Sequence, residues 1–261
     1  MAILTYFFTV KVKALIIFAI LLLISSLRSG AQYPFEAFDS IHYESFNNWI
    51  KYDQLKNKKT YHQTLTIKKY FQKNDSLTIQ LSSFLDTNKD SSYIRIFRNK
   101  HQIQKIFEPM RYLGYAIWGP LIVADFNNDS LKDLKLNISY MSNGIGMCSR
   151  VIYLLQTREG IFKKISFDDN LEYGNRPERD FGKNGKFEIV TMTLNTYNNH
   201  NYWTFDIFEF MNDGLINVDE KFGYPIMIQF LKKPNYRVTD EISKEEMNDF
   251  KLIIPKNMDI H

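Results

Sequence analysis

Cysteine is nearly absent from this sequence, because Cys148 is the only one among 261 residues. A single cysteine excludes an intramolecular disulfide. Cys148 precedes an apolar run and has no histidine nearby, which favours a buried, inert thiol over a catalytic one. A disulfide to another chain stays open as the alternative.

Recognisable catalytic and metal motifs are also missing. The sequence contains no P-loop, dinucleotide-binding fingerprint, nucleophile elbow or HExxH zinc motif. Its five histidines are scattered without the spacing of metal ligands. These absences favour a protein that is not an enzyme.

An excess of one charge sign is lacking as well. The formal net charge is +4, and residues 1–31 carry Lys11, Lys13 and Arg28 without an acid, so their removal leaves +1. A surface that binds nucleic acid needs a concentrated basic face, whereas here Lys and Arg are spread among nearly equal numbers of Asp and Glu. We therefore expect no nucleic-acid partner.

The most extended apolar run lies close to the N-terminus. Lys11 and Lys13 precede the uncharged residues 14–23, and residues 29–31 supply small side chains for cleavage. This pattern predicts a signal peptide over residues 1–31, with an uncleaved N-terminal anchor as the alternative. The run is short for a membrane span. We expect an exported protein, periplasmic or secreted, with no stable membrane span after cleavage.

Apolar and polar side chains alternate from about residue 61 onward, as is typical of half-buried strands. In residues 132–140, for example, Leu134, Leu136 and Ile138 share one face of a predicted strand. Short clusters of turn-forming residues separate the strand candidates. The sequence therefore predicts a mainly β protein, an antiparallel meander of hairpins that is sandwich-like or partial propeller-like. The strand candidates are residues 77–81, 93–97, 103–107, 121–124, 132–140, 151–155, 161–167, 187–194, 203–210 and 225–231.

Helical patterns occur only near the two ends. Apolar spacing predicts a helix within residues 38–52, and Ser243 opens a capping-box pattern before a short helix that reaches residue 250. Residues 168–186 are polar, with Pro177 and three glycines, and lack periodicity. The expected organisation is a helical segment at 32–60, a β domain at 61–167, a loop or boundary at 168–186, and C-terminal β hairpins with a short helix at 187–261.

Residues 125–133 space oxygen atoms as a calcium-binding loop does. Asp125, Asn127, Asp129 and Asp133 occupy loop positions 1, 3, 5 and 9, and Leu131 at position 7 can contribute its backbone carbonyl. Three carboxylates this close repel one another without a cation between them. We predict a structural Ca²⁺ here. The alternative is an ordinary turn, since Asp and Asn also favour turns without metal.

The surroundings of this loop distinguish it from a helix-loop-helix hand. Strand candidates lie on both sides, Leu136 stands where a bidentate Glu would be, and Ser130 replaces the usual glycine. These features predict weak binding, with a dissociation constant on the order of 10⁻⁴ to 10⁻³ M. Residues 86–91 partly match the loop but lack the carboxylate at position 9, which favours a simple hairpin turn.

Residues 119–167 resemble the FG-GAP and VCBS repeats through their strand-DxNxDxxxDL-strand arrangement. The resemblance implies a β-hairpin unit with calcium in its turn, and this chain has one good copy. A wider region, residues 76–167, resembles small exported bacterial β proteins with a single such loop. That group includes periplasmic inhibitors of lysozyme-like enzymes and immunity proteins, which implies a calcium-stiffened β domain with a binding face.

A predicted hairpin tip near residue 200 offers a second candidate surface. Tyr197, His200 and Tyr202 place aromatic and polar groups around the turn, where they could bind a glycan or a protein partner. Trp203 instead continues a stripe with Phe205 and Ile207 that we expect to face the core.

Together these patterns predict an exported, calcium-binding, non-catalytic module that binds or inhibits an unidentified protein or glycan. The alternative is a secreted hydrolase acting on glycans or cell-wall polymer. That alternative needs two carboxylates that converge on a cleft, and adjacent pairs such as Asp168 and Asp169 occur in the sequence. Convergence depends on the fold.

Overall fold

The computed structural model describes residues 32–52, 60–84, 92–109, 119–142, 147–171, 175–211 and 214–261. The predicted signal peptide at residues 1–31 lies outside these ranges, and so does the predicted turn at residues 86–90. In the part of the chain that is described, no helix combines the length and the apolar character needed to cross a membrane.

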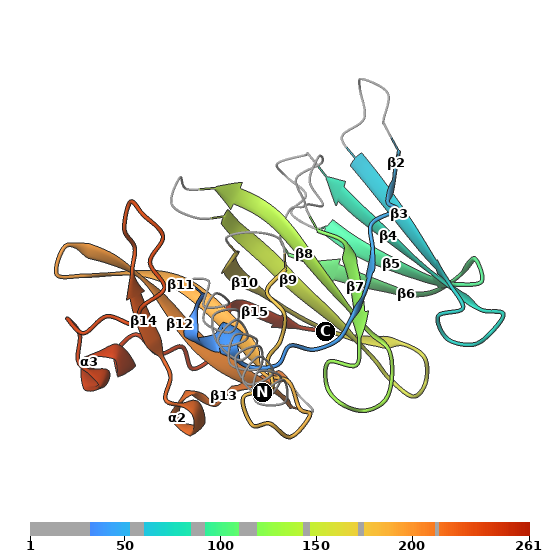
Figure 1. The fold of residues 1–261 in the computed structure, drawn as a ribbon. Helices are drawn as coiled ribbons and strands as arrows, with labels where there is room; N and C mark the ends of the chain where they lie inside the picture. Colours follow the sequence, from blue (N-terminus) through green and yellow to red (C-terminus); the bar gives the residue numbers. More distant parts are fainter. Residues whose placement is uncertain are drawn as a thin grey trace, which may run out of the picture.

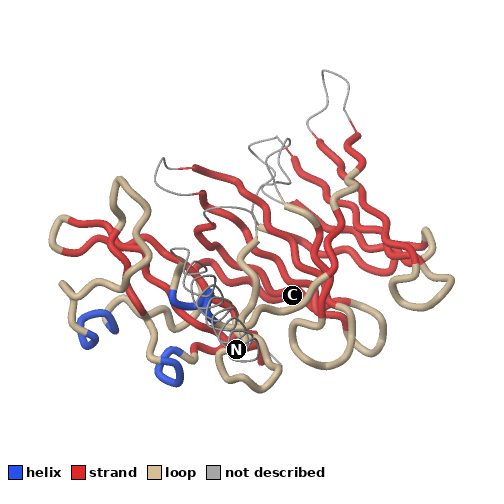
Figure 2. Tube along the Cα trace, in the orientation of Figure 1, coloured by secondary structure: helices blue, strands red, loops and turns tan. Residues whose placement is uncertain are grey.

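The described strands form three antiparallel sheets that lie next to one another, with a six-stranded sheet in the middle (Figures 1 and 2). The mainly β, antiparallel and sandwich-like fold expected from the sequence is confirmed. The five-stranded sheet has the order β2-β3-β4-β5-β6, and the six-stranded sheet has the order β1-β7-β8-β9-β10-β15. In the four-stranded sheet β12 pairs with β11, β13 and β14.

The strand bounds are as follows. The five-stranded sheet contains β2 (Ile50–Tyr52), β3 (Thr60–Lys68), β4 (Ser76–Phe84), β5 (Ser92–Arg98) and β6 (His101–Glu108). The six-stranded sheet contains β1 (Glu44–Phe46), β7 (Leu121–Ala124), β8 (Asp133–Ser142), β9 (Met147–Gln156), β10 (Phe162–Leu171) and β15 (Lys256–Ile260). The four-stranded sheet contains β11 (Ile189–Tyr197), β12 (His200–Met211), β13 (Gly214–Asn217) and β14 (Ile226–Gln229).

The middle sheet is buried on both faces. Leu134, Leu136 and Ile138 of β8 pack with the five-stranded sheet in one hydrophobic core, as their alternation predicts. Tyr153 of β9 and Phe167 of β10 point the other way, into a second core shared with the four-stranded sheet. Strands covered on both sides read as nearly continuous apolar runs, which explains the sequence of β9.

A third core covers the far face of the four-stranded sheet. The 3-10 helix η1 (Pro34–Ala37) brings Phe35 against Phe205 of β12, with ring centroids 5.1 Å apart. Trp203 and Ile207 join this core, so the predicted inward stripe of β12 is confirmed. Beyond this sheet lie the short helices α2 (Asp219–Phe222) and α3 (Lys244–Asn248).

The two helix predictions have different outcomes. Ser243 caps α3 as predicted, since its Oγ accepts from the amide of Glu246 at 3.2 Å. The helix predicted within residues 38–52 is wrong, because this segment forms the edge strands β1 and β2. Phe46 and Trp49 pack against the core between the five-stranded and six-stranded sheets. Because the backbone is extended, β1 forms hydrogen bonds with β7 of the six-stranded sheet, and β2 with β3 of the five-stranded sheet.

The predicted boundary at residues 168–186 also differs from the structure at its start. Strand β10 continues to Leu171, and the described residues that follow, 175–188, are irregular with isolated bridges at Arg179. Moreover, β15 pairs with β10, so a strand from the predicted C-terminal region completes the middle sheet. The sequence did not predict β15.

A buried ionic network holds β15 to the middle sheet. Arg150 of β9 is 1% exposed, and it donates to Glu108 Oε1 at 2.8 Å and to the carbonyl of Asn257 in β15 at 2.7 Å. Lys164 of β10 has no exposed surface and binds the carboxylate of Asp259 in β15. Buried charges are costly unless they are paired, so these contacts require β15 to be in place.

Candidate functional site

The loop between β7 and β8 has a tightly hydrogen-bonded backbone. Oδ1 of Asp125 accepts from the amide of Asp129 at 2.9 Å, and Oδ2 accepts from the amide of Ser130 at 2.8 Å. Asn128 and Ser130 adopt left-handed backbone, with φ of 60° and 70°. Oδ1 of Asp129 accepts from the amide of Leu131 at 2.8 Å. The predicted ligands at positions 1 and 5 therefore lie within one compact turn.

Asn127 supplies an acceptor that the protein leaves unused. Its Nδ2 donates to Oδ2 of Asp129 at 3.1 Å, which fixes the orientation of the amide. Its Oδ1 is buried and has no hydrogen-bond partner. Buried polar atoms are normally satisfied, so an unpartnered oxygen in a turn that also contains two carboxylates fits a bound cation.

Asp133 closes the loop from the inside. Its side chain has no exposed surface, and its two oxygens accept from the amides of Phe126 at 2.9 Å and Gln156 at 2.7 Å. Burial raises the pKa of the Asp133 carboxyl to about 7, and the charges of Asp129 and Asp125 add to this. The carboxylate therefore ties the loop to the end of β9.

The placement of Asp133 affects the predicted ligand set. Among the described residues, no three His, Cys, Asp or Glu side chains converge closely enough to form a metal-binding group. Asp125, Asn127 and Asp129 share the outer part of the loop, with Leu131 following them, whereas both Asp133 oxygens are engaged by backbone amides. The ligands expected at positions 1, 3 and 5 lie close together, and position 9 acts as a buttress.

A second loop, at residues 180–188, repeats this arrangement. Oδ1 of Asp180 accepts from the amide of Asn184 at 3.0 Å, and Oδ2 accepts from the amide of Gly185 at 2.8 Å. Oε2 of Glu188 accepts from the amide of Phe181 at 3.0 Å, as Asp133 does from Phe126. Every residue in these hydrogen bonds lies 55 positions after the equivalent residue of the first loop, so Asp180 corresponds to Asp125.

The backbone of the second loop matches as well. Lys183 and Gly185 are left-handed, with φ of 51° and 78°, at the positions of Asn128 and Ser130. The bridge between Arg179 and Glu188 corresponds to the pairing of Ala124 with Asp133. The loop at residues 180–188 was not predicted from the sequence. The shared spacing D-F-x-x-[DN]-[SG]-x-x-[DE] could have revealed it, although Gly182 and Asn184 replace Asn127 and Asp129.

The predicted partner-binding tip is only partly accessible. Tyr202 is 1% exposed, lies in a core cluster with Met227, and donates its hydroxyl to Glu241 Oε2 at 3.1 Å. Burial removes Tyr202 from any binding surface. Tyr197 is half-buried and donates to Glu246 Oε1 at 2.7 Å, so His200 is the only one of the three predicted residues that is exposed.

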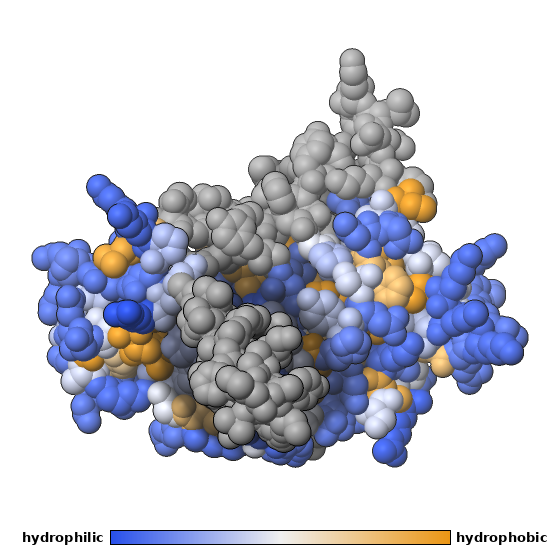
Figure 3. Space-filling model, viewed as in Figure 1, coloured by the Kyte–Doolittle hydropathy of each residue, from blue (hydrophilic) through white to orange (hydrophobic). Residues whose placement is uncertain are grey.

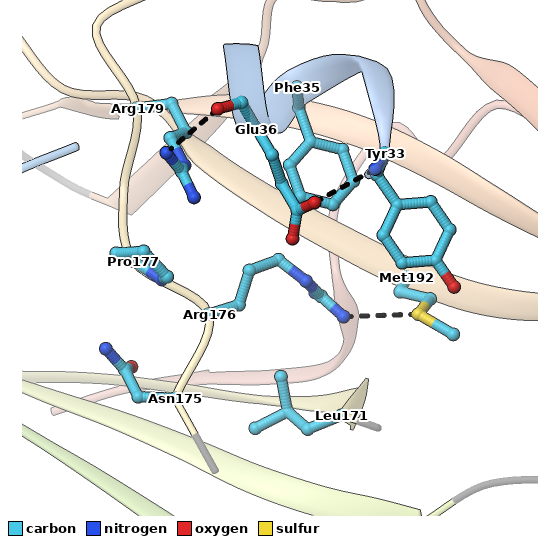
Figure 4. A pocket seen from close by; sticks show the side chains of 9 residues that line it. All are labelled: Tyr33, Phe35, Glu36, Leu171, Asn175, Arg176, Pro177, Arg179 and Met192. Carbon is cyan, nitrogen blue, oxygen red and sulfur yellow. Dashed lines mark hydrogen bonds between the residues drawn. The ribbon is translucent and has the colours of Figure 1, made fainter. Parts of the chain in front are cut away.

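A cavity of about 210 Å³ lies between η1, the residues after β10 and β11 (Figure 4). Glu36 points toward its centre and is the only carboxylate among the described residues that line it. Arg176 crosses the cavity, but its guanidinium is already bound to Asp169 Oδ2 at 2.7 Å and to the Asn170 carbonyl at 2.7 Å. Asp168 likewise pairs with Arg150, so the two adjacent carboxylates serve different arginines.

The two loops thus share one pattern of hydrogen bonds, and the first loop offers oxygen atoms to a cation. Their neighbours along the chain are strands of the six-stranded and four-stranded sheets. Comparisons of this chain with models of known protein families, with curated proteins and with solved structures found no match.

Proposed function

We propose that this protein is an exported, non-catalytic binding module whose middle sheet is stiffened by a calcium ion in the loop at residues 125–133. The observation that carries the proposal is the unpartnered, buried Oδ1 of Asn127, in the same tight turn as the carboxylates of Asp125 and Asp129. Hard cations such as Ca²⁺ prefer several oxygen ligands from one tight turn.

The position of the loop supports a structural role for the ion. Asp133 connects the loop to Gln156 at the end of β9, and β7 and β8 leave the loop as paired strands. A cation that neutralises Asp125 and Asp129 would relieve their repulsion at this edge of the sheet. The expected effect is added stability of the middle sheet.

The resemblance to FG-GAP and VCBS repeats is consistent with this proposal. The second loop forms the same hydrogen bonds between an isolated bridge at Arg179 and strand β11, which supports a loop unit that occurs twice. A binding or inhibitory role is supported by the three-sheet architecture, which leaves one sheet face open. The alternative hydrolase needs a second carboxylate beside Glu36 in the cavity, and the described residues of its lining include none.

Thermal unfolding of the secreted protein with and without calcium tests the proposal. At about 10 mM CaCl₂ and the dissociation constant expected above, we expect the midpoint to rise by about 3 to 10 °C. Asp125→Asn combined with Asp129→Asn should abolish the rise. The matched control is Asp180→Asn, which changes the equivalent residue of the second loop and should leave the calcium response intact.

Three results would contradict the calcium assignment. One is an unchanged midpoint in wild type, another is a calcium response that survives the double substitution, and the third is a response that Asp180→Asn alone removes. Isothermal calorimetry on the same variants gives the stoichiometry. N-terminal sequencing of the protein recovered from the medium or periplasm tests cleavage after residue 31.

A further inference from the structure

The five-stranded sheet has one face buried and one face open. Leu65, Ile79 and Ile94 point into the core shared with the middle sheet. Because side chains alternate along strands, the intervening residues form the opposite face, on which Thr66, Lys68, Lys105 and Phe107 are exposed. Strand pairing places Thr64, Gln80, Arg95 and Lys105 in one row across this outer face.

A parallel row of the outer face is more aromatic. His62, Ser82, Tyr93 and Phe107 pair across four strands, next to the row that contains Arg95. Phe107 is 49% exposed, whereas Tyr93 is only 9% exposed. The outer face therefore combines one open aromatic ring with adjacent cationic side chains.

The ionised side chains of this sheet are almost all positive. Residues 50–108 contain twelve Lys and Arg against five Asp and Glu, a formal charge of +7, although the chain from residue 32 onward carries only +1. The only acid within the five strands is Glu108, which is fully buried and bound to Arg150. The even spread of charge inferred from the whole sequence therefore conceals a basic sheet.

The cations of the outer face lack carboxylate partners. Arg95 lies 4.8 Å from the centre of the Tyr93 ring, and Lys105 lies 4.4 Å from it, with the Phe107 ring 4.9 Å away. Neither cation forms an ion pair with a described residue, and the guanidinium of Arg95 donates only a long hydrogen bond, to Gln80 Oε1 at 3.4 Å. Both charges are held in place by rings and stay available to an anion. Lys68 adds a third, exposed cation at the end of β3.

The accessible chemistry favours acidic sugars over nucleic acid. Single-stranded nucleic acid is bound by successive aromatic rings that each stack on a base. Here Arg95 and Lys105 cover Tyr93, and Phe107 is the ring that remains open. A chain of acidic sugars needs cations for its carboxylates and an exposed ring for a sugar face, and this surface provides both. In Figure 3 the part of the molecule formed by β2–β6 is mostly hydrophilic, with few hydrophobic side chains between.

We infer that the outer face of the five-stranded sheet binds an acidic polysaccharide. Arg95, Lys105 and Lys68 pair with carboxylates of the polymer, and Phe107 contacts a sugar ring. This inference rests on the proposed binding function and names the class of its partner. It does not depend on calcium, because the loop at residues 125–133 belongs to a different sheet.

The test measures binding of fluorescently labelled oligogalacturonate to the full secreted protein, with EDTA present to exclude calcium bridges. We expect binding that weakens from about 50 to about 200 mM salt, as charge-driven binding does. Arg95→Gln with Lys105→Gln should weaken it at least about tenfold, which corresponds to about 1.4 kcal/mol. Lys232→Gln with Lys233→Gln removes the same charge from exposed positions elsewhere and should change binding less than about twofold.

Several outcomes would overturn the inference. If binding is absent, or if both double substitutions weaken it equally, the outer face is not a specific binding surface. Tighter binding of a 25-nucleotide oligothymidine or of phosphatidylglycerol vesicles through Arg95 and Lys105 would assign the face to another polyanion. Circular dichroism confirms that the variants fold. A calcium response without oligogalacturonate binding defeats only this inference, whereas binding in EDTA without a calcium response defeats only the proposed calcium site.

Discussion

Two buried carboxyl groups, Asp206 on β12 and Asp219 at the start of α2, lie side by side without exposed surface. Oδ1 of Asp206 accepts from the amide of Leu252 at 2.9 Å, and Oδ1 of Asp219 accepts from the amide of Ile207 at 2.6 Å. Burial, and then the neighbouring Asp219, raise the pKa of Asp206 to about 8, although Lys251 opposes this. The folded protein therefore keeps a proton between the two groups at neutral pH.

This proton makes stability depend on pH. The folded pKa of Asp206 is raised above the ordinary value of 3.8, so the folded state binds more protons than the unfolded state between about pH 4 and pH 8. Stability must then fall as pH rises through that window. From pH 5 to pH 8 we expect a loss of more than about 1.4 kcal/mol, the free energy of a tenfold change in proton affinity.

Asp206→Asn should reduce this dependence, because an amide can donate to Asp219 without a titrating proton, whereas Asp133, whose pKa is also raised, continues to contribute. Urea denaturation at pH 5, 6.5 and 8 measures the effect, and the variant should gain on wild type at the highest pH. Asp240→Asn changes an exposed carboxylate and should leave the wild-type slope unchanged. A pH slope as steep in Asp206→Asn as in wild type would show that Asp206 does not contribute to it.

At the scale of the elements, the side chain of Gln104 in β6 forms two hydrogen bonds to the backbone of β10, as a neighbouring strand would. Nε2 of Gln104 donates to the carbonyl of Phe162 at 2.7 Å, and its Oε1 accepts from the amide of Phe162 at 2.8 Å. Both backbone groups lie at the start of β10, where they would otherwise lack partners. Gln104 therefore couples the five-stranded sheet to the middle sheet.

Gln104→Ala should destabilise the protein by about 1 to 3 kcal/mol, because it leaves two half-buried backbone groups unsatisfied. Chemical denaturation at pH 7 measures the change. Gln102→Ala alters an exposed glutamine of the same strand and should cost less than about 0.5 kcal/mol. Equal effects of the two substitutions would show that the side-chain bonds to Phe162 add nothing.

Element type could be read from the sequence where the pattern was local. Residues 121–124 form β7 with the predicted bounds, because four consecutive apolar residues suit a strand that is buried on both faces. The helix prediction for residues 38–52 failed because aromatic residues three or four positions apart can also lie in short edge strands, where only some of them pack against the core. β15 carries little apolar pattern, and its partner β10 lies far away along the chain. Local periodicity cannot reveal such a pairing.

The candidate sites were predictable to different degrees for similar reasons. Asp125 and Asp129 were found because loop spacing is a local property. The buttress role of Asp133 depends on the amide of Gln156, and the burial of Tyr202 depends on residues from β14 and α3. The basic outer face was missed because Arg95 and Lys105 are neighbours only through strand pairing.

The three sheets share their cores, so the molecule should unfold as one unit. Trp49 packs at the core between the five-stranded and six-stranded sheets, and Trp203 lies in the core beyond the four-stranded sheet. The second core connects these two regions through the middle sheet. Shared cores on both faces of one sheet favour a single cooperative transition.

Two variants that each retain one of these tryptophans can report on the two ends separately. Trp118→Phe is combined with either Trp203→Phe or Trp49→Phe, and each protein is unfolded in urea. In each variant the fluorescence transition should coincide with its own far-UV circular dichroism transition. A fluorescence transition of Trp203 that precedes the dichroism change would instead indicate that the four-stranded sheet unfolds independently.

The late position of β15 has a consequence for how the protein is made. A ribosome releases β10, which ends at Leu171, well before it has synthesised Lys256, where β15 begins. Until then the outer edge of β10 presents unpaired amides and carbonyls, and Arg150 and Lys164 lack their partners in β15. Open strand edges invite pairing with other chains. The nascent protein therefore depends on its last strand to avoid aggregating with its own copies.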